Sequence, residues 1–307
     1  PAIAVDRALG LHGIGVCHTF LPGKRKKRIS ALVLYQKHND EETDRWSLCQ
    51  RKLVVFSHGN STDIGYMFTA YVNLCKTHDV DVLAYDYSGY GLSDGNVGEK
   101  SIYQDIEHVY AYVRNELGVK PDNIILYGNS LGSAPSSYLA SMPDKFPIGG
   151  LVLDAPISSA IRLQVGSIPS TPKFDAFINI EYLKRKALYP TLIIHGTADR
   201  VIPIQHAQEL AYIVEVRHSE LLAREEESAT SFAETDDVLR SQPSVDRKTA
   251  SIDLFKVPED FLRTWWVAGA GHNNIQGDNA VAYNRTLDTF FKICRKWQNE
   301  TKLKTRC

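Results

Sequence analysis

Six short runs of apolar residues recur along the chain, separated by longer stretches in which apolar and polar residues are mixed. Within each run most residues are apolar and do not alternate with polar ones, which is typical of strands buried on both faces of a parallel sheet. Strands that alternate with helices in this way indicate an α/β fold, a mostly parallel twisted sheet with helices on both faces. We expect these strands at 52–57, 80–86, 123–127, 150–154, 190–195 and 264–268, with an antiparallel strand at 29–35.

The stretches between the strands carry apolar residues at helical spacing, and we interpret these stripes as faces packed on the core. One helix is predicted to begin with a capping box formed by Ser101 and Gln104 and to end at Gly118. The last helix has Asp278 as its candidate N-cap. We expect helices over 64–75, 102–117 and 283–294.

The length and composition favour one large domain. The chain has 307 residues, of which 43% are hydrophobic and 10% aromatic, so a chain-wide disordered protein is excluded. We predict a single domain over 1–307, with an acidic, flexible insertion at 217–251. Residues 155–186 contain three prolines and are too short for a large lid, so only a minimal cap is expected.

Charge and cysteine content limit the partners and the compartment. A net charge of −1 excludes a global polyanion binder, and no nucleic-acid module is recognisable. Five scattered cysteines without C-x-x-C spacing indicate neither a disulfide framework nor a zinc site, and they favour a reducing, cytoplasmic location. One local basic cluster offers two interpretations, a solvated turn or a peripheral contact with an anionic membrane; it consists of Lys24, Arg25, Lys26, Lys27 and Arg28.

Residues 128–132 spell G-x-S-x-G directly after the predicted strand 123–127. In this motif the serine lies on a strained turn between a strand and a helix, and the two glycines let these elements approach closely. The turn lifts the hydroxyl clear of the sheet, so Ser130 is the candidate nucleophile. A glycine-rich turn in which the serine merely caps a helix is the alternative.

A serine hydroxyl needs a base that removes its proton and a carboxylate that orients the base. Asp199 follows the predicted strand 190–195 and His272 follows the strand 264–268, so both should join Ser130 at the carboxyl edge of the sheet. The order Ser, Asp, His along the chain is the order expected on such a sheet. The sequence therefore predicts a triad of Ser130, His272 and Asp199.

Other residues compete for two of these roles. Asp154 also follows a strand and is the alternative carboxylate. Three further histidines lie near the same predicted edge, but only His272 has a glycine-flanked loop beyond the last strand; the three are His58, His195 and His206.

The oxyanion that forms when a serine attacks a carbonyl needs fixed N–H donors. The backbone N–H groups of Leu131 and Asn60 are the candidates, with Ser61 as the alternative to Asn60. A helix that begins near Asp63 is expected to add the positive end of its dipole. The side chain of Asn60 has a second interpretation, in which it only ties the loop. This chemistry requires neither metal nor cofactor, and we predict none.

Several strings of the sequence resemble the α/β-hydrolase superfamily. They are FSHGN (56–60), YDYSGYG (85–91), IILYGNSLG (124–132), IHGTAD (194–199) and GAGHN (269–273). The string FDAFINIE (174–181) is similar to the branch called alpha/beta hydrolase domain group seventeen. This resemblance implies an enzyme that removes palmitate from cysteine thioesters on membrane-associated proteins.

These observations lead to one favoured hypothesis and two alternatives. The favoured one is a serine hydrolase that cleaves acyl esters and thioesters, with S-acylated proteins or small acyl esters as substrates. A carboxylesterase, lipase or serine peptidase would use the same triad, because these enzymes differ in the leaving group and not in the catalytic residues. A catalytically silent interaction protein is the alternative from another class, and the intact Ser, Asp and His argue against it.

Overall fold

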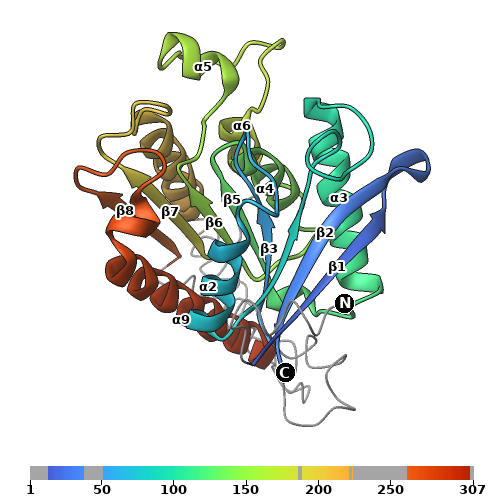
Figure 1. The fold of residues 1–307 in the computed structure, drawn as a ribbon. Coiled ribbons are helices and arrows are strands. Elements are labelled where there is room, and N and C mark those ends of the chain that lie inside the picture. The colour runs from blue at the N-terminus through green and yellow to red at the C-terminus, as the bar shows by residue number, and fades with distance from the viewer. Residues whose placement is uncertain (1–12, 38–50, 186–188, 221–222, 224–260, 305–307) are drawn as a thin grey trace, which may run out of the picture.

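The computed structural model of the chain describes residues 13–37, 51–185, 189–220, 223 and 261–304. These residues build an eight-stranded sheet in the order β1-β2-β4-β3-β5-β6-β7-β8 (Figure 1). β2 pairs antiparallel with β1 and with β4, and every other neighbouring pair is parallel. The strands are β1 (Ile14–Pro22), β2 (Arg28–Gln36), β3 (Leu53–Ser57), β4 (Asp81–Tyr85), β5 (Ile124–Asn129), β6 (Gly150–Asp154), β7 (Thr191–Gly196) and β8 (Leu262–Val267).

Helices cover both faces of the sheet (Figure 1). On one face α2 and α9 pack on side chains such as Phe56 and Ile194; on the other, α3, α4 and α6 pack on side chains such as Leu126. A further helix spans 205–220 and contributes Leu210 to the second core. The labelled helices are α2 (Phe68–His78), α3 (Glu99–Asn115), α4 (Ser133–Ala140), α5 (Ala160–Val165), α6 (Asn179–Arg185), α8 (Ile275–Asp278) and α9 (Ala280–Lys304).

The central strands are buried on both faces, as the apolar runs predict. All residues of β3, β4, β6 and β7 are buried. The predicted α/β fold and the seven predicted strands are confirmed, each within two residues of its expected ends. β1 was not predicted, because only three of its nine residues are buried and its apolar residues are interrupted by Gly15, His18 and Thr19.

Three predicted helix starts are wrong. α3 begins at Glu99 after Gly98, which makes no side-chain cap, so Ser101 and Gln104 lie inside the helix and form no capping box. Asp278 is the last residue of α8 and not the N-cap of α9. The first helix starts at Phe68. α3 ends at Asn115 with Glu116 as its C-cap, shortly before the predicted end at Gly118, whose left-handed φ of 66° turns the chain after the helix.

α5 and α6 lie between β6 and β7, and α5 stands above the carboxyl edge of the sheet, so the cap is minimal, as expected (Figure 1). The predicted insertion at 217–251 begins too early, because residues 217–220 still continue the helix 205–220. Apart from residue 223, the rest of that insertion lies outside the described residues. Cys17, Cys75 and Cys294 are free thiols. No helix in the described part of the chain is both long and apolar enough to span a bilayer.

Candidate active site

Ser130 lies on a strained turn at the carboxyl end of β5. Its φ is 52°, a left-handed conformation that costs a non-glycine residue about 1 to 3 kcal/mol. The glycines on either side allow the turn to pack tightly: a Cβ on Gly128 would lie 2.5 Å from the carbonyl oxygen of Gly132. A Cβ on Gly132 would lie only 1.9 Å from the carbonyl oxygen of Ser57 on β3. The close approach that the G-x-S-x-G motif predicts is confirmed.

A buried side chain fixes the turn from below. The hydroxyl of Ser133 donates to the carbonyl oxygen of Ser130 at 2.6 Å. The same hydroxyl oxygen accepts a hydrogen bond from Nδ2 of Asn179 at 3.0 Å, and Nδ2 also donates to the carbonyl oxygen of Ile157 at 2.8 Å. The strained serine is therefore tied to α6 of the cap.

The structure brings Ser130, His272 and Asp199 into one chain of hydrogen bonds. Nδ1 of His272 lies 2.7 Å from Oδ2 of Asp199, and Nε2 lies 3.1 Å from Oγ of Ser130. A carboxylate only accepts, so Nδ1 carries the proton and Nε2 is left to accept from the serine hydroxyl. The three residues follow β5, β7 and β8, and so meet at the carboxyl edge of the sheet.

Asp199 is held in place from three sides. Its Oδ1 accepts the backbone N–H groups of Val201 at 2.8 Å and Ile202 at 2.9 Å. Burial alone would raise its pKa, but the hydrogen bonds from His195, His272 and the backbone of Ile202 outweigh burial and hold the pKa well below its ordinary value. Asp199 is therefore ionised at neutral pH.

His195 is a residue that sequence reasoning placed near the edge but gave no role. Its Nε2 donates to the carbonyl oxygen of Ile202 at 2.8 Å and lies 3.3 Å from Oδ2 of Asp199. The imidazole is fully buried on β7. The string IHGTAD (194–199) could have indicated this role, because His195 lies only four residues before Asp199 at the end of the same strand.

Asp154, the alternative acid, has different partners. Its Oδ2 accepts from the hydroxyl of Tyr127 at 2.8 Å and from Nε2 of Gln276 at 3.4 Å. It is buried in the wall of the pocket, and this burial raises its pKa. In the described part of the chain, His272 hydrogen-bonds Asp199 and not Asp154. Tyr127 and Gln276 were not singled out from the sequence.

The candidate oxyanion loop lies directly beside the serine. A Cβ on Gly59 would lie 3.5 Å from Cβ of Ser130, so the next residue, Asn60, borders the reacting hydroxyl. The side chain of Asn60 accepts from the hydroxyl of Tyr90 at 2.7 Å, which supports its interpretation as a tie. Ser61 has a left-handed φ of 56°.

The expected helix near Asp63 is absent from this position, because α2 starts only at Phe68. Instead, Oδ1 of Asp63 accepts the backbone N–H of Tyr66 at 2.8 Å and closes a turn. The dipole of α2 therefore does not point directly at the loop.

Two further histidines near the edge have structural partners. Nδ1 of His58 lies 2.8 Å from the carbonyl oxygen of Gly59, and its Nε2 lies 3.4 Å from Oδ1 of Asp86. Nδ1 of His206 lies 2.9 Å from Oγ of Ser158. Neither imidazole contacts Ser130 in the described residues.

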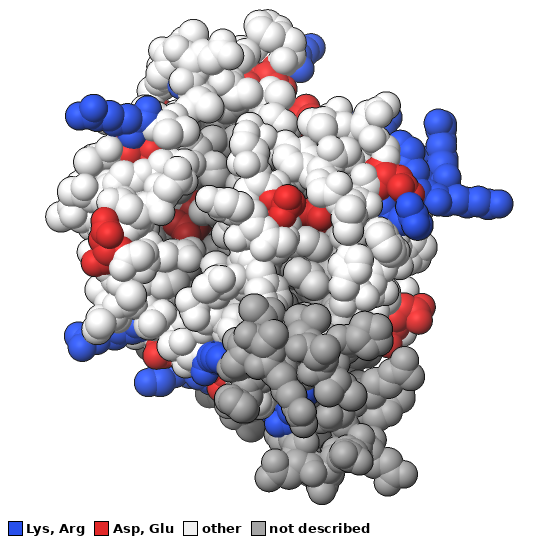
Figure 2. Space-filling view, in the orientation of Figure 1, with Lys and Arg blue, Asp and Glu red and all other residues white. Residues whose placement is uncertain are grey.

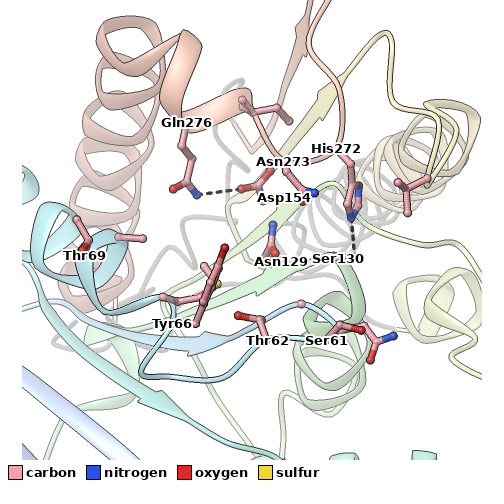
Figure 3. A pocket seen from close by; sticks show the side chains of 16 residues that line it. Ser61, Thr62, Tyr66, Thr69, Asn129, Ser130, Asp154, His272, Asn273 and Gln276 are labelled. Carbon is pink, nitrogen blue, oxygen red and sulfur yellow. Dashed lines mark hydrogen bonds between the residues drawn. The ribbon is translucent and has the colours of Figure 1, made fainter. Parts of the chain in front are cut away.

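A pocket of about 760 Å³ opens beside Ser130 (Figure 3). Polar side chains from loops and helices border it, and Figure 3 shows Asp154 between Gln276 and His272, with His272 directed at Ser130. No group of three His, Cys, Asp or Glu side chains among the described residues could hold a metal ion. The residues that line the pocket are Gly59, Asn60, Ser61, Thr62, Tyr66, Met67, Thr69, Ala70, Asn129, Ser130, Asp154, Val201, His272, Asn273, Ile275 and Gln276.

Comparison with known sequences agrees with this architecture. The family model described as Serine aminopeptidase, S33, matches residues 49–179. The chain is 41% identical over 162 residues to alpha/beta hydrolase domain-containing protein 17C of Xenopus tropicalis, an alignment that covers 53% of this chain and 51% of the relative. It is 40% identical over 157 residues to protein 17B of Homo sapiens, covering 51% and 53%. The chain thus spans about half the length of the curated relatives it matches.

Comparison with solved structures supports the fold. The chain is similar to an esterase of Pyrococcus furiosus, with a TM-score of 0.60, 15% identity and 94% of each chain covered. It is also similar to an alpha-beta hydrolase from Vibrio vulnificus, with a TM-score of 0.57, 17% identity, and coverage of 92% of this chain and 85% of that one.

The sheet order, the strained serine turn and these structural similarities identify the α/β-hydrolase fold. Over about half of its length the sequence is similar to the alpha/beta hydrolase domain-containing 17 proteins.

Proposed function

We propose that this α/β-hydrolase is a serine hydrolase that cleaves acyl esters and thioesters, with Ser130 as nucleophile, His272 as general base and acid, and Asp199 as the acid that orients the base. The observation that carries the proposal is the continuous hydrogen-bond chain from Ser130 Oγ through His272 to Asp199 Oδ2. Nucleophile, base and orienting carboxylate within hydrogen-bond reach are the arrangement that this chemistry needs.

The reaction proceeds in two halves. Nε2 of His272 takes the proton of Ser130 as Oγ attacks the acyl carbon. The resulting oxyanion accepts hydrogen bonds from the backbone N–H groups of Asn60 and Leu131. The tetrahedral intermediate collapses, the bond to the leaving thiol or alcohol breaks, and His272 returns the proton to it. Water then gives its proton to Nε2 and attacks the acyl-serine, which releases the acid and restores the Ser130 hydroxyl.

The substrate that we favour is a palmitoyl-cysteine thioester of a protein, the activity that the resemblance to group seventeen implies. Similarity to the 17B and 17C proteins at 40% to 41% identity supports this choice. Carboxylesterase, lipase or serine peptidase activity on the same triad is the alternative, because all of these reactions pass through an acyl-serine.

A substrate series tests the proposal. We would measure kcat/KM for p-nitrophenyl esters from C2 to C16 and for a palmitoyl-cysteine peptide, together with a pre-steady-state burst. The proposal predicts a burst, and a kcat/KM for the palmitoyl peptide that exceeds that of the short esters. A short-chain optimum without peptide hydrolysis would favour the carboxylesterase, and no burst with any substrate would favour the silent protein.

We also propose that the basic turn between β1 and β2 contacts an anionic membrane surface. Lys24, Arg25, Lys26 and Lys27 are exposed, whereas Arg28 pairs with Asp94 at 3.0 Å. The turn lies at the right of the molecule, where blue side chains gather at the surface (Figure 2). Each exposed cation near an anionic surface adds about 1 kcal/mol of attraction.

Vesicle sedimentation tests this contact. Replacing all four exposed cations by Gln should abolish sedimentation with phosphatidylserine vesicles and leave the hydrolysis of p-nitrophenyl acetate unchanged. Equal sedimentation of the two proteins would instead assign the turn to solvent alone.

A further inference from the structure

One buried carboxyl group in the pocket has no part in the proposed reaction. Asp154 ends β6 and is only 2% exposed, yet it forms part of the pocket wall that also contains Ser130 and His272. Figure 3 places it between Gln276 and His272, on the wall of the pocket. A carboxyl group buried this deeply is unfavourable unless it is hydrogen-bonded, so its partners indicate what it is for.

Its hydrogen bonds form a relay with a defined direction. The hydroxyl of Tyr127 donates to Oδ2 of Asp154, so in its contact with Tyr283 the Tyr127 oxygen must accept. Tyr283 therefore donates to Tyr127, and the Tyr283 oxygen accepts from Nε2 of Gln276 at 3.0 Å. Burial raises the pKa of both tyrosines, so both hydroxyls keep their protons. With Asp154 ionised, every donor in the relay is directed toward it, and the hydrogen bonds from Tyr127 and Gln276 offset part of the rise in pKa that burial causes.

The relay uses only one of the two carboxylate oxygens. Both hydrogen bonds from Tyr127 and Gln276 reach Oδ2, and among the described residues no hydrogen bond is assigned to Oδ1. Among the described residues, Oδ1 is not one of the side-chain atoms that are both fully buried and without a partner, so it retains some exposure. Because Asp154 lines the pocket, Oδ1 is an acceptor available to a molecule bound there.

The charged residues that line the pocket also favour the binding of a cation. Of the described residues that line it, none is Lys or Arg, and Asp154 is the one carboxylate. A cation that enters the pocket meets the carboxylate of Asp154 and no Lys or Arg side chain, in a partly enclosed site where electrostatic attraction is screened less than in water.

We propose that Asp154 is a specificity-determining residue that binds a cationic group of the substrate beside the acyl carbon attacked by Ser130. For an acylated peptide, this group is a lysine or arginine side chain or a free α-amine near the acylated residue. The inference rests on the proposed function, since it assumes that Ser130 is the nucleophile. A substrate without a cation leaves Oδ1 without a donor and is turned over less efficiently.

Pairs of substrates with equal shape and different charge test this proposal. On the leaving-group side, acetylthiocholine is compared with its neutral isostere 3,3-dimethylbutyl thioacetate. On the acyl side, the p-nitrophenyl ester of 6-aminohexanoic acid is compared with that of heptanoic acid. We expect kcat/KM of the cationic member to exceed that of the neutral one by about tenfold in at least one pair. For the aminohexanoyl ester this is the factor typical of a charged hydrogen bond, whereas the trimethylammonium group of acetylthiocholine has no N–H and contributes only its charge.

Two variants isolate the charge. Asp154→Asn keeps the shape and should bring the ratio of that pair close to one, while the neutral esters are still hydrolysed. Tyr283→Phe is the matched control, because it removes a relay hydroxyl and keeps the carboxylate, so the ratio should persist. Ratios near one in the wild-type protein, an unchanged ratio in Asp154→Asn, or an equal loss in both variants would overturn the proposal.

A measurement on the wild-type protein covers the case in which Asp154→Asn does not fold. 6-Aminohexan-1-ol, whose ammonium group can donate to Oδ1, should inhibit the hydrolysis of p-nitrophenyl acetate at least about tenfold more strongly than heptan-1-ol, and equal inhibition would reject the cation subsite. Failure of the proposed function gives a different result, because then no ester is hydrolysed or Ser130→Ala hydrolyses the esters as fast as the wild type.

Discussion

Nε2 of His195 lies 3.3 Å from Oδ2 of Asp199. This is the same oxygen that lies 2.7 Å from Nδ1 of His272, so one carboxylate oxygen faces two imidazoles. His195 is held by its donation to the carbonyl oxygen of Ile202, and it thereby limits where Asp199 can move. We therefore assign His195 the role of a positioning residue for the triad acid.

Replacing His195 should lower turnover more than substrate binding. His195→Leu removes the imidazole N–H whose nitrogen lies 3.3 Å from Oδ2 of Asp199, and we expect kcat to fall about tenfold with little change in KM. His195→Gln keeps a side-chain donor and should recover much of the loss. Equal kcat values in the wild type and His195→Leu would show that the contact with Asp199 has no catalytic consequence.

Asp199 and Asp154 should respond differently to the same substitution. Asp199→Asn removes the acceptor for Nδ1 of His272 and should lower kcat by a factor on the order of 10⁴. Asp154→Asn should change the kcat for a small neutral ester only a few-fold, because Asp154 contacts Tyr127 and Gln276 and not the base. If Asp154→Asn caused the larger loss, the assignment of the acid would be wrong.

Gly132 should not tolerate a side chain. An alanine Cβ there would lie 1.9 Å from the carbonyl oxygen of Ser57, so the serine turn and β3 would have to separate. We expect Gly132→Ala to lower the free energy of unfolding by about 3 kcal/mol or more, and Tm by roughly 6 to 12 °C. Gly277→Ala is the control, because no atom lies within 4 Å of the added Cβ. Similar Tm values for the two variants would contradict the tight packing of the turn.

His206 should make the fold sensitive to mild acid. Burial lowers its pKa, and its Nδ1 accepts the backbone N–H of Ser158 at 3.1 Å, a contact that imidazolium cannot make. The unfolded chain binds this proton near pH 6.5 and the folded one only at lower pH, so the contribution to stability is present above about pH 6.5 and lost as the pH falls below it.

His206→Asn supplies an acceptor that does not titrate. Its Tm should fall less than that of the wild type between pH 7.5 and pH 5.5, as measured by circular dichroism. The pKa of His218 is also lowered by burial, but His218 is present in both proteins and cancels in the comparison. Parallel Tm curves would exclude His206 as the acid-sensitive group.

The sheet could be predicted because its central strands leave a strong signal. β3, β4, β6 and β7 are buried along their whole length, so each is an apolar run with turn residues on both sides. β1 lies at the edge, and its apolar residues neither form an unbroken run nor alternate regularly with polar ones, so hydrophobicity does not distinguish it from a loop.

Helix starts were less predictable because a tertiary contact can override a local signal. Glu99 begins α3, where its Oε1 accepts from the hydroxyl of Tyr103 and, at 2.7 Å, from the backbone N–H of Phe177. Phe177 is 78 positions away, so this contact is invisible in the local sequence. The Ser101 and Gln104 pattern was therefore a misleading signal.

In the candidate site, too, the sequence predicts some residues, and only the fold reveals the others. Ser130, Asp199 and His272 follow strands in an order that fixes their common edge, so their meeting could be predicted. Tyr127 lies within the string 124–132, which gives it no role, and Gln276 lies in no recognised string; both reach Asp154 only through the fold. Their relay could be recognised only in three dimensions.

The most direct test of the account is labelling of the wild-type protein with a fluorophosphonate probe, followed by mass-spectrometric mapping of the modified residue. The account predicts a single adduct on Ser130, and no labelling in a folded Ser130→Ala variant. An adduct on another residue, or labelling that persists in Ser130→Ala, would contradict it.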